Sequence, residues 1–291
     1  MFHPKAMSSI FKCSITALIW TLGLSSTSAF AANKIAFVRA TSTSTPSISP
    51  YQLLDGQKGT VWCSQPEARD NALRIDFNSE QTIQELKVQF VLDKDGQVDE
   101  SHQRPKFIAI SDSASVREVR VRNQSKAQFI KLNPPIRSKS IVITFPNLRP
   151  GSSDEAALCL DEVQPISPSG PLGGKGMMKQ LKSLTPAEQS FLGHWVDDVS
   201  APEKTFFFHL GRKVKFTYAP LIEGKPVTHL GSWSVKGDQM SLRSKRKNIK
   251  IDARLTRTDN GLEQIQQLSV VSPDKAYGYF SATFEPEPIS R

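Results

Sequence analysis

Short apolar segments separated by turn residues follow one another along almost the whole chain after residue 34. Leu86–Phe90 and Ile141–Phe145 alternate apolar and polar side chains, which is typical of strands with one buried face. Eight such segments before residue 166 favour an antiparallel sandwich or jelly roll. They are Ile35–Arg39, Leu73–Phe77, Ile83–Val91, Phe107–Ser111, Val116–Arg122, Phe129–Leu132, Ile141–Phe145 and Ala157–Pro165.

A second group of segments follows Thr185-Pro186-Ala187-Glu188. This tetrapeptide predicts a short helix, because a Thr N-cap, Pro at the first helical position and Glu at the third form a capping box. The later segments are joined by glycine-containing turns, which favours a small closed β-barrel over residues 185–291. They are Thr205–Leu210, Val214–Tyr218, His229–Val235, Gln239–Arg243, Ile249–Thr256, Glu263–Val271 and Ala276–Phe284. The fold class predicted for the chain is therefore all-β.

Proline and glycine are concentrated in residues 165–178. Such a density disfavours both a helix and a paired strand, so residues 167–184 are interpreted as a linker. This division gives an N-terminal domain at 32–166 and a C-terminal domain at 185–291.

The first 31 residues have the features of a secretory signal peptide. Lys5 and Lys12 precede the apolar run Ile15–Leu24, and Ala29-Phe30-Ala31 forms a small-residue cleavage site. The run is too short to span a bilayer. We therefore expect an exported protein, in the periplasm or outside the cell, that starts near Ala32.

Removal of the signal peptide would leave two cysteines, Cys63 and Cys159. In an exported chain they are candidates for a disulfide, which would close a loop worth about 4–5 kcal/mol in the chain-entropy treatment. The alternative is a pair of buried thiols. Metal-binding motifs such as CxxC or HExxH do not occur.

The formal net charge of +9 becomes +7 without Lys5 and Lys12, and most of the excess lies in the C-terminal domain. A basic segment at a predicted hairpin tip could bind phosphate, an anionic lipid surface or an acidic polysaccharide, or could simply be a solvated turn. Export and the lack of interleaved aromatic residues argue against nucleic acid. The basic residues are Arg243, Lys245, Arg246, Lys247 and Lys250.

Sequence signatures of catalysis are missing: the chain has no GxSxG elbow, P-loop or GxGxxG motif. The histidines are scattered, and Asp197 and Asp198 would point to opposite faces of a strand. We therefore expect a non-catalytic protein that needs no cofactor for a reaction.

Four motifs occur in order between residues 53 and 163. They are Leu53-Leu54-Asp55-Gly56 with Thr60-Val61-Trp62-Cys63; Leu73-Arg74-Ile75-Asp76-Phe77; Arg104-Pro105-Lys106 with Ile110-Ser111-Asp112; and Pro150-Gly151 with Asp154 and Cys159-Leu160-Asp161-Glu162-Val163.

These motifs resemble discoidin-like domains of the galactose-binding-like class, and among them the NADase-type glycan-binding domain, over about residues 36–166. The resemblance implies a jelly roll, a Cys63–Cys159 bond and glycan binding, but not NADase activity. It also implies a Ca²⁺ site with Asp55, Thr60 and Glu162 as ligands. Gln57 stands where many relatives carry a second Asp, which removes one negative charge from that site.

Sugar recognition needs an aromatic face and planar polar groups. In the N-terminal domain we expect these from the loop residues Tyr51, Gln103, Arg104, Arg149 and Asp154. Trp62, next to Cys63, is interpreted as packing against the disulfide.

The C-terminal domain resembles a short lipocalin-like barrel through Gly193-x-Trp195 and Gly231-Ser-Trp233. Both Trp195 and Trp233 are interpreted as barrel core. Two further functions therefore stand beside glycan binding. The first is a periplasmic carrier of an apolar ligand in a barrel lined by Phe206–Phe208, Phe216 and Tyr218. The second is an envelope protein-interaction factor.

Overall fold

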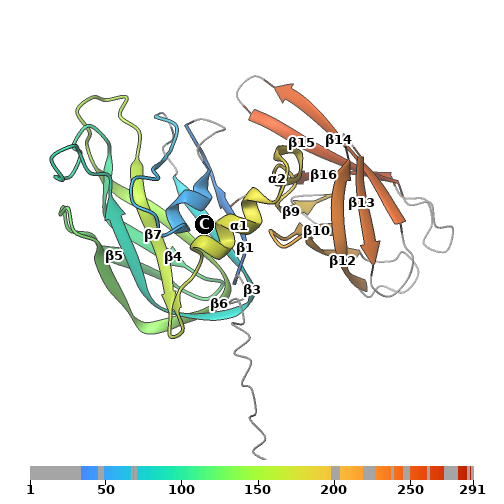
Figure 1. The fold of residues 1–291 in the computed structure, drawn as a ribbon, viewed down its shortest axis with the longest axis horizontal. Coiled ribbons are helices and arrows are strands. Elements are labelled where there is room, and N and C mark those ends of the chain that lie inside the picture. The colour runs from blue at the N-terminus through green and yellow to red at the C-terminus, as the bar shows by residue number, and fades with distance from the viewer. Residues whose placement is uncertain are drawn as a thin grey trace, which may run out of the picture. The chain divides into compact units, whose positions relative to one another are not determined.

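The computed structural model describes residues 34–44, 49–66, 68, 71–197, 204–218, 227–236, 239–244, 250–260, 263–271, 281–286 and 289 (Figure 1). The predicted signal peptide, residues 1–31, lies outside this part of the chain. None of the helices that the structure describes is long and apolar enough to cross a membrane.

The N-terminal domain is one antiparallel sheet with the strand order β2-β7-β3-β6-β4-β5, in which β1 also pairs with β3 and β8 with β7 (Figure 1). A 3₁₀ helix, η1, spans Pro50–Leu54. The strands are β1 Ile35–Ala40, β2 Trp62–Cys63, β3 Ala72–Phe90, β4 Arg104–Ser111, β5 Val116–Arg120, β6 Gln128–Arg149, β7 Cys159–Ser167 and β8 Gly170–Pro171. The all-β jelly-roll prediction agrees with this architecture.

Two pairs of predicted strands are in fact single long strands. β3 includes Leu73–Phe77 and the segment predicted at Ile83–Val91 up to Phe90, and β6 includes both Phe129–Leu132 and Ile141–Phe145. Between the two segments predicted in β3, the polar residues Asn78–Glu80 lie exposed where the β3–β6 register shifts. Such irregularities bend a strand without ending it, so each strand continues past the point where its apolar pattern breaks.

The predicted disulfide is confirmed: Cys63 and Cys159 are bonded. The two cysteines face each other in the register of β2 and β7, next to the Trp62–Leu160 pair. The Trp62 side chain is fully buried, and its indole N–H donates to Thr43 Oγ1 at 3.5 Å. The disulfide therefore lies directly beside the core of the N-terminal domain.

The segment predicted to be a linker contains regular structure, so that part of the prediction is wrong. β7 continues to Ser167 and pairs with β8, and helix α1 spans Lys175–Lys182. Its glycines occupy the positions that need them: Gly173 has φ +104, and a Cβ there would lie 2.5 Å from the Leu54 carbonyl oxygen. After Gly174, Met177 and Leu181 are one helical turn apart and both are buried.

The C-terminal strands pair in the order β10-β11-β12-β13-β14-β15-β16-β9, and the β9–β10 pairing closes the ring. The predicted helix start is confirmed: Thr185 caps helix α2, Pro186–Gln189, and Glu188 completes the capping box. The strands are β9 Gly193–Val196, β10 Lys204–Phe208, β11 Lys213–Tyr218, β12 Val227–Lys236, β13 Gln239–Ser244, β14 Lys250–Asn260, β15 Glu263–Val271 and β16 Ser281–Pro286. The resemblance to lipocalins stays a prediction.

Aromatic side chains fill the described part of the barrel interior. Phe208 packs edge-on against both Phe191 and Trp233, with ring centroids 6.1 and 5.4 Å apart. Trp195 and Trp233 are each 2% exposed, as their interpretation as core requires. Phe206 is also buried, whereas the side chains of Phe216 and Tyr218 lie outside the described residues.

The basic segment also falls largely outside the described residues. Arg243 on β13 pairs in register with Lys250 on β14, which agrees with a hairpin. The structure describes neither the connecting residues 245–249 nor the Arg243 and Lys250 side chains. Binding to an anionic envelope surface through this segment stays a prediction.

Two histidines sandwich the ring of Phe207. The His194 ring stacks on it with a centroid distance of 3.9 Å. The His209 ring is tilted relative to Phe207, with a centroid distance of 4.0 Å. His209 Nδ1 is 3.2 Å from Asn78 Oδ1, and His194 Nε2 is 3.6 Å from Asp76 Oδ1. These contacts place a titratable cluster where β9 and the turn after β10 meet β3.

Loss of the disulfide is expected to destabilise the fold. Replacing both Cys63 and Cys159 by Ala should lower the free energy of unfolding by about 4 kcal/mol, because the unfolded chain regains the entropy of an open loop. Urea unfolding followed by tryptophan fluorescence measures this difference. A change of less than about 1 kcal/mol would contradict the assigned role of the bond.

Acid is expected to weaken the fold through His209. Burial, and next the charges of His194 and Lys213, lower its pKa to about 4, with Lys215 acting in the same direction and Asp76 in the opposite one. Below about pH 6.5, His209 is protonated in the unfolded state but stays neutral in the folded state. The free energy of unfolding therefore falls as the pH is lowered from 6.5 to 4.

In the His209→Gln variant, the loss of unfolding free energy between pH 6.5 and 4 should be smaller by about 2–3 kcal/mol at most. Thermal unfolding at half-unit pH steps measures it, with His102→Gln, in a partly exposed loop, as the control. An unchanged pH slope in His209→Gln would contradict the assignment.

Candidate functional site

Two loops of the N-terminal domain meet beside the disulfide. Gln103 lies next to Leu158 in an isolated parallel bridge, where its N–H donates to the Ala157 carbonyl at 2.9 Å. Gly151 is the point of closest approach: a Cβ there would lie 2.6 Å from the Ser101 carbonyl oxygen and 2.3 Å from the Ala156 Cβ. The backbone of residues 99–104 is therefore fixed against residues 150–158.

Arg104 lies beneath these loops at the start of β4. It is 6% exposed, and its Nη2 donates to the Pro150 carbonyl at 3.2 Å. Its Nε and Nη1 are buried and make no hydrogen bond to the protein, although Nη1 lies 3.4 Å from Glu100 Oε1. A buried guanidinium with unused donors is uncommon, because each unpaired donor costs free energy.

Polar side chains surround Arg104 at the surface. Asp99 Oδ2 lies 3.5 Å from His102 Nε2, and both side chains are about one-third exposed. Hydrogen bonds from the hydroxyl and backbone N–H of Ser101 hold the pKa of Asp99 below its usual range, so that carboxylate stays ionised. Glu100 is far more exposed, with 72% of its side chain accessible. We name the set Asp99, Glu100, His102, Gln103, Arg104 and Asp154 the Arg104 cluster.

Two of the five residues predicted for glycan binding, Gln103 and Arg104, are adjacent in this cluster, and a third, Asp154, lies on the neighbouring loop of residues 150–158. Arg104 lies buried at the bottom of the cluster, and Gln103 is half-buried beside it. Asp154 is exposed on the loop that packs against Ser101. Arg149 pairs with Arg104 in the β4–β6 register, but its guanidinium donates to the backbone carbonyls of Pro105 and Val121. Arg149 thus joins strands.

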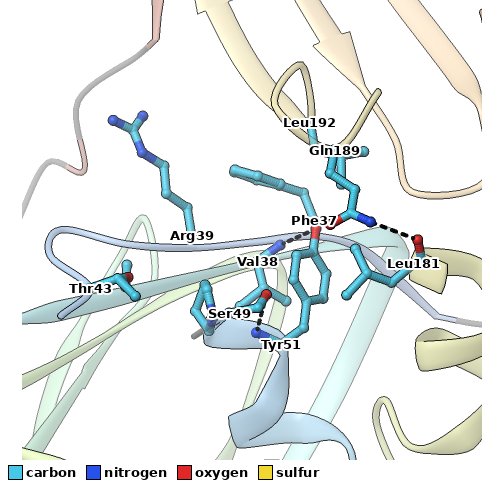
Figure 2. A pocket seen from close by; sticks show the side chains of 11 residues that line it. Phe37, Val38, Arg39, Thr43, Ser49, Tyr51, Leu181, Gln189 and Leu192 are labelled. Carbon is cyan, nitrogen blue, oxygen red and sulfur yellow. Dashed lines mark hydrogen bonds between the residues drawn. The ribbon is translucent and has the colours of Figure 1, made fainter. Parts of the chain in front are cut away.

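Tyr51 is not an exposed loop residue, and that expectation is wrong. It belongs to η1 and is 4% exposed, and its hydroxyl accepts a hydrogen bond from the Val38 N–H at 3.2 Å. Burial raises its pKa, so the phenol stays neutral. Its ring lies against a small pocket of about 260 Å³ that Leu181 and Gln189 also line (Figure 2). The helical turn therefore turns the Tyr51 ring inward.

The side chains of the residues implied as calcium ligands interact with protein groups. Asp55 Oδ1 accepts hydrogen bonds from the Gln57 N–H at 2.7 Å and the Thr60 hydroxyl at 3.1 Å. Glu162 is instead ion-paired with Lys87, whose ammonium supplies the positive charge that a cation would bring. Among the described residues, no three His, Cys, Asp or Glu side chains group as a metal site.

As arranged, these residues do not fit a calcium ion, because Lys87 would have to leave Glu162 first. Ca²⁺ binding stays a prediction, and no step of the proposed function depends on it. Asp161 also lies in this region, where it accepts the Gly59 N–H at 2.8 Å, and burial raises its pKa.

The sequence interpretation did not select Asp99, Glu100 or Lys87. Asp99 and Ser101 are spaced for an Asx turn, in which an Asp side chain binds the backbone N–H two residues later, and that spacing was available. In the register of β3 with β7, Glu162 is opposite Gln89 and Lys87 is opposite Gln164, so Lys87 reaches Glu162 diagonally, and no local pattern gives this register.

Comparison with protein-family models finds no match, and comparison with the curated proteins finds none either. Solved structures of carbohydrate-binding modules are similar at low sequence identity. The CBM32-1 and CBM32-2 domains of ZmpB from Clostridium perfringens, in complex with GalNAc, have 13% identity and a TM-score of 0.36, with 46% of this chain and 33% of that chain covered.

The family 32 module of NanJ from the same organism, in complex with galactose, has 12% identity and a TM-score of 0.35 over 45% of this chain and 97% of that one. A fucose-binding module from Streptococcus pneumoniae has 19% identity and a TM-score of 0.34 over 45% and 93%. Scores this low do not decide what this chain binds, so its function must be inferred from its own residues.

The protein is expected to be stable without calcium. Because Lys87 already neutralises Glu162, the unfolding temperature should be the same within about 1 °C in excess EDTA and in millimolar CaCl₂. Differential scanning calorimetry makes the comparison, with MgCl₂ as the ionic-strength control. A rise of several degrees in the unfolding temperature with Ca²⁺ alone would contradict this expectation and would show that the ion displaces Lys87 from Glu162.

Proposed function

We propose that this chain is an exported, non-catalytic carbohydrate-binding protein whose N-terminal jelly roll binds a glycan at the Arg104 cluster. The observation that carries the proposal is the buried Arg104 guanidinium, with two nitrogens that lack a hydrogen-bond partner in the protein, under polar side chains on two fixed loops. Export is supported by the predicted signal peptide and by a disulfide, which persists in oxidising compartments.

The exposed Glu100 carboxylate forms an ion pair with Nη1 of the guanidinium. An ion pair with so exposed a partner contributes little to stability, about 0–1 kcal/mol, so a ligand hydroxyl can replace it at small cost. Once Glu100 moves away, the planar guanidinium presents donors to neighbouring sugar hydroxyls. Asp99 and Asp154 add acceptors, and His102 adds a group that can donate or accept.

The cluster is not arranged as a nucleophile with its base. Ser101 and His102 both contact Asp99, and the Ser101 hydroxyl donates to Asp99 Oδ1 at 2.6 Å. A nucleophilic serine would instead have to donate to the histidine. This geometry supports recognition over catalysis.

The carrier and envelope-factor functions remain alternatives. The carrier would need space in the barrel, where Phe208 packs against both Trp233 and Phe191. The envelope factor would bind a protein partner, and the basic segment near Arg243, predicted to contact an anionic envelope surface, has side chains that are not described. In the barrel, the buried Trp233 Nε1 also lacks a hydrogen-bond partner, but it is a single donor on a ring that packs against Phe208, whereas Arg104 has two such nitrogens below polar surface residues.

A glycan array probed with the purified chain, followed by calorimetry with the best ligand, tests the proposal. Arg104→Ala should abolish binding. His102→Ala and Asp154→Ala should each weaken it about tenfold, the effect of one lost hydrogen bond of ~1.4 kcal/mol. Glu118→Ala, which removes an exposed carboxylate on β5, is the control and should bind normally.

Because Arg104 is buried, circular dichroism must show that its variant is folded. The exposed His102 and Asp154 variants provide the test if it is not. Silence across a broad array, or unchanged affinity in both exposed variants, would contradict glycan binding at this cluster.

A further inference from the structure

A cleft of about 600 Å³ lies on the N-terminal domain at β3 and β7. The loop after η1 contributes Lys58 and Gly59, β3 contributes Lys87 and Gln89, and β7 contributes Asp161 and Glu162. This volume falls within the range of small-molecule sites in proteins, which is roughly 300–1,000 Å³. None of the Arg104 cluster residues lines it.

The cleft contains a buried acceptor that the protein leaves unused. Glu162 is 4% exposed and is ion-paired with Lys87 through Oε2, while its Oε1 is buried and makes no hydrogen bond. A carboxylate oxygen in this state carries a desolvation cost that a hydroxyl donor would offset. The side-chain amide of Gln89, which also lines the cleft, already has a partner, since its Nε2 donates to the Ser125 carbonyl at 2.8 Å.

The edge of the cleft is basic. Lys58 and Lys126 are both exposed there, so the lining carries three ammonium groups against the two carboxylates of Asp161 and Glu162. A positive ligand would therefore be repelled at the edge, and an anionic group would be attracted there.

Apolar surface adjoins these charges. Leu92 lines the cleft and is 39% exposed, and Phe129 on β6 is 59% exposed. Phe129 lies directly across from Lys87 in the β3–β6 register, so the two side chains are on the same face of the sheet. An exposed aromatic ring beside polar groups suits the C–H face of a pyranose.

We propose that this cleft is a second binding site, specific for an acidic saccharide such as a uronic acid. One sugar hydroxyl donates to Glu162 Oε1, the ring packs along Leu92 and Phe129, and the carboxylate is held by Lys58 and Lys126. The site uses none of the residues of the Arg104 cluster, so either site can exist without the other.

Titration of the purified chain with methyl β-D-glucuronide and with methyl β-D-glucoside tests the site, because the two ligands differ only in the carboxylate. Binding is followed by amide chemical shifts of Gly59 and Lys126 in NMR spectra. We expect saturable binding of the glucuronide at about tenfold higher affinity than the glucoside. Two exposed charge contacts together account for such a factor.

Replacing both Lys58 and Lys126 by Ala should remove the tenfold preference without changing the glucoside affinity. Glu162→Gln should weaken both glycosides. Lys139→Ala, which removes an exposed lysine of β6 that does not line the cleft, is the matched control. The His102→Ala variant distinguishes binding in the cleft from binding at the Arg104 cluster. Retained glucuronide binding in His102→Ala supports the cleft even if glycan binding at the cluster fails.

Equal affinities for the two glycosides, or a preference that survives loss of both lysines, would overturn the proposal. So would a Ca²⁺-dependent shift that Glu162→Gln abolishes, with no response to either glycoside, because the free oxygen would then belong to a cation site. A crystal structure at high glucuronide concentration with only water on Glu162 Oε1 would also overturn it.

Discussion

The disulfide between Cys63 and Cys159 is the constraint on which the N-terminal domain depends. It joins the two-residue strand β2 to the first residue of β7, although the two cysteines are 96 positions apart. Trp62 fills the core on one side, and on the other the backbone of Gln103 and Leu158 ties the early loops to the late ones. Each proposed glycan site includes a residue of β7 or of the loop before it, Glu162 in the cleft and Asp154 in the Arg104 cluster, so the bond supports recognition as well as stability.

Much of the fold could be predicted because it is encoded locally. The alternation in Ile141–Phe145, the capping box at Thr185 and the barrel strands are each readable within a few residues. What could not be read was whether a polar break ends a strand. Asn78–Glu80 resembles a turn, but β6 pairs with β3 on both sides of it, so pairing overrides local propensity. Likewise, the glycines before α1 predicted a linker where they serve as turns and as the helix N-cap.

The site was predictable in part, for the same reason. The sequence predicts Gln103, Arg104 and Asp154 as loop residues of one binding site. Their exposure differs, because Arg104 is buried and Asp154 is exposed. Tyr51 was misplaced because the 3₁₀ turn after Ser49 directs its ring inward. Glu162 and Lys87 meet only through the register of β3 with β7, a long-range property that residue types do not encode.

The central claim is that loops fixed by one disulfide form the glycan site, and glycan affinity with and without that bond tests it most directly. The variant with Ser at both positions 63 and 159 is compared with the oxidised protein at a temperature where circular dichroism shows both folded. Because the freed loops must be ordered on binding, we predict an affinity at least about tenfold lower in the variant. Equal affinity in the two proteins would contradict it.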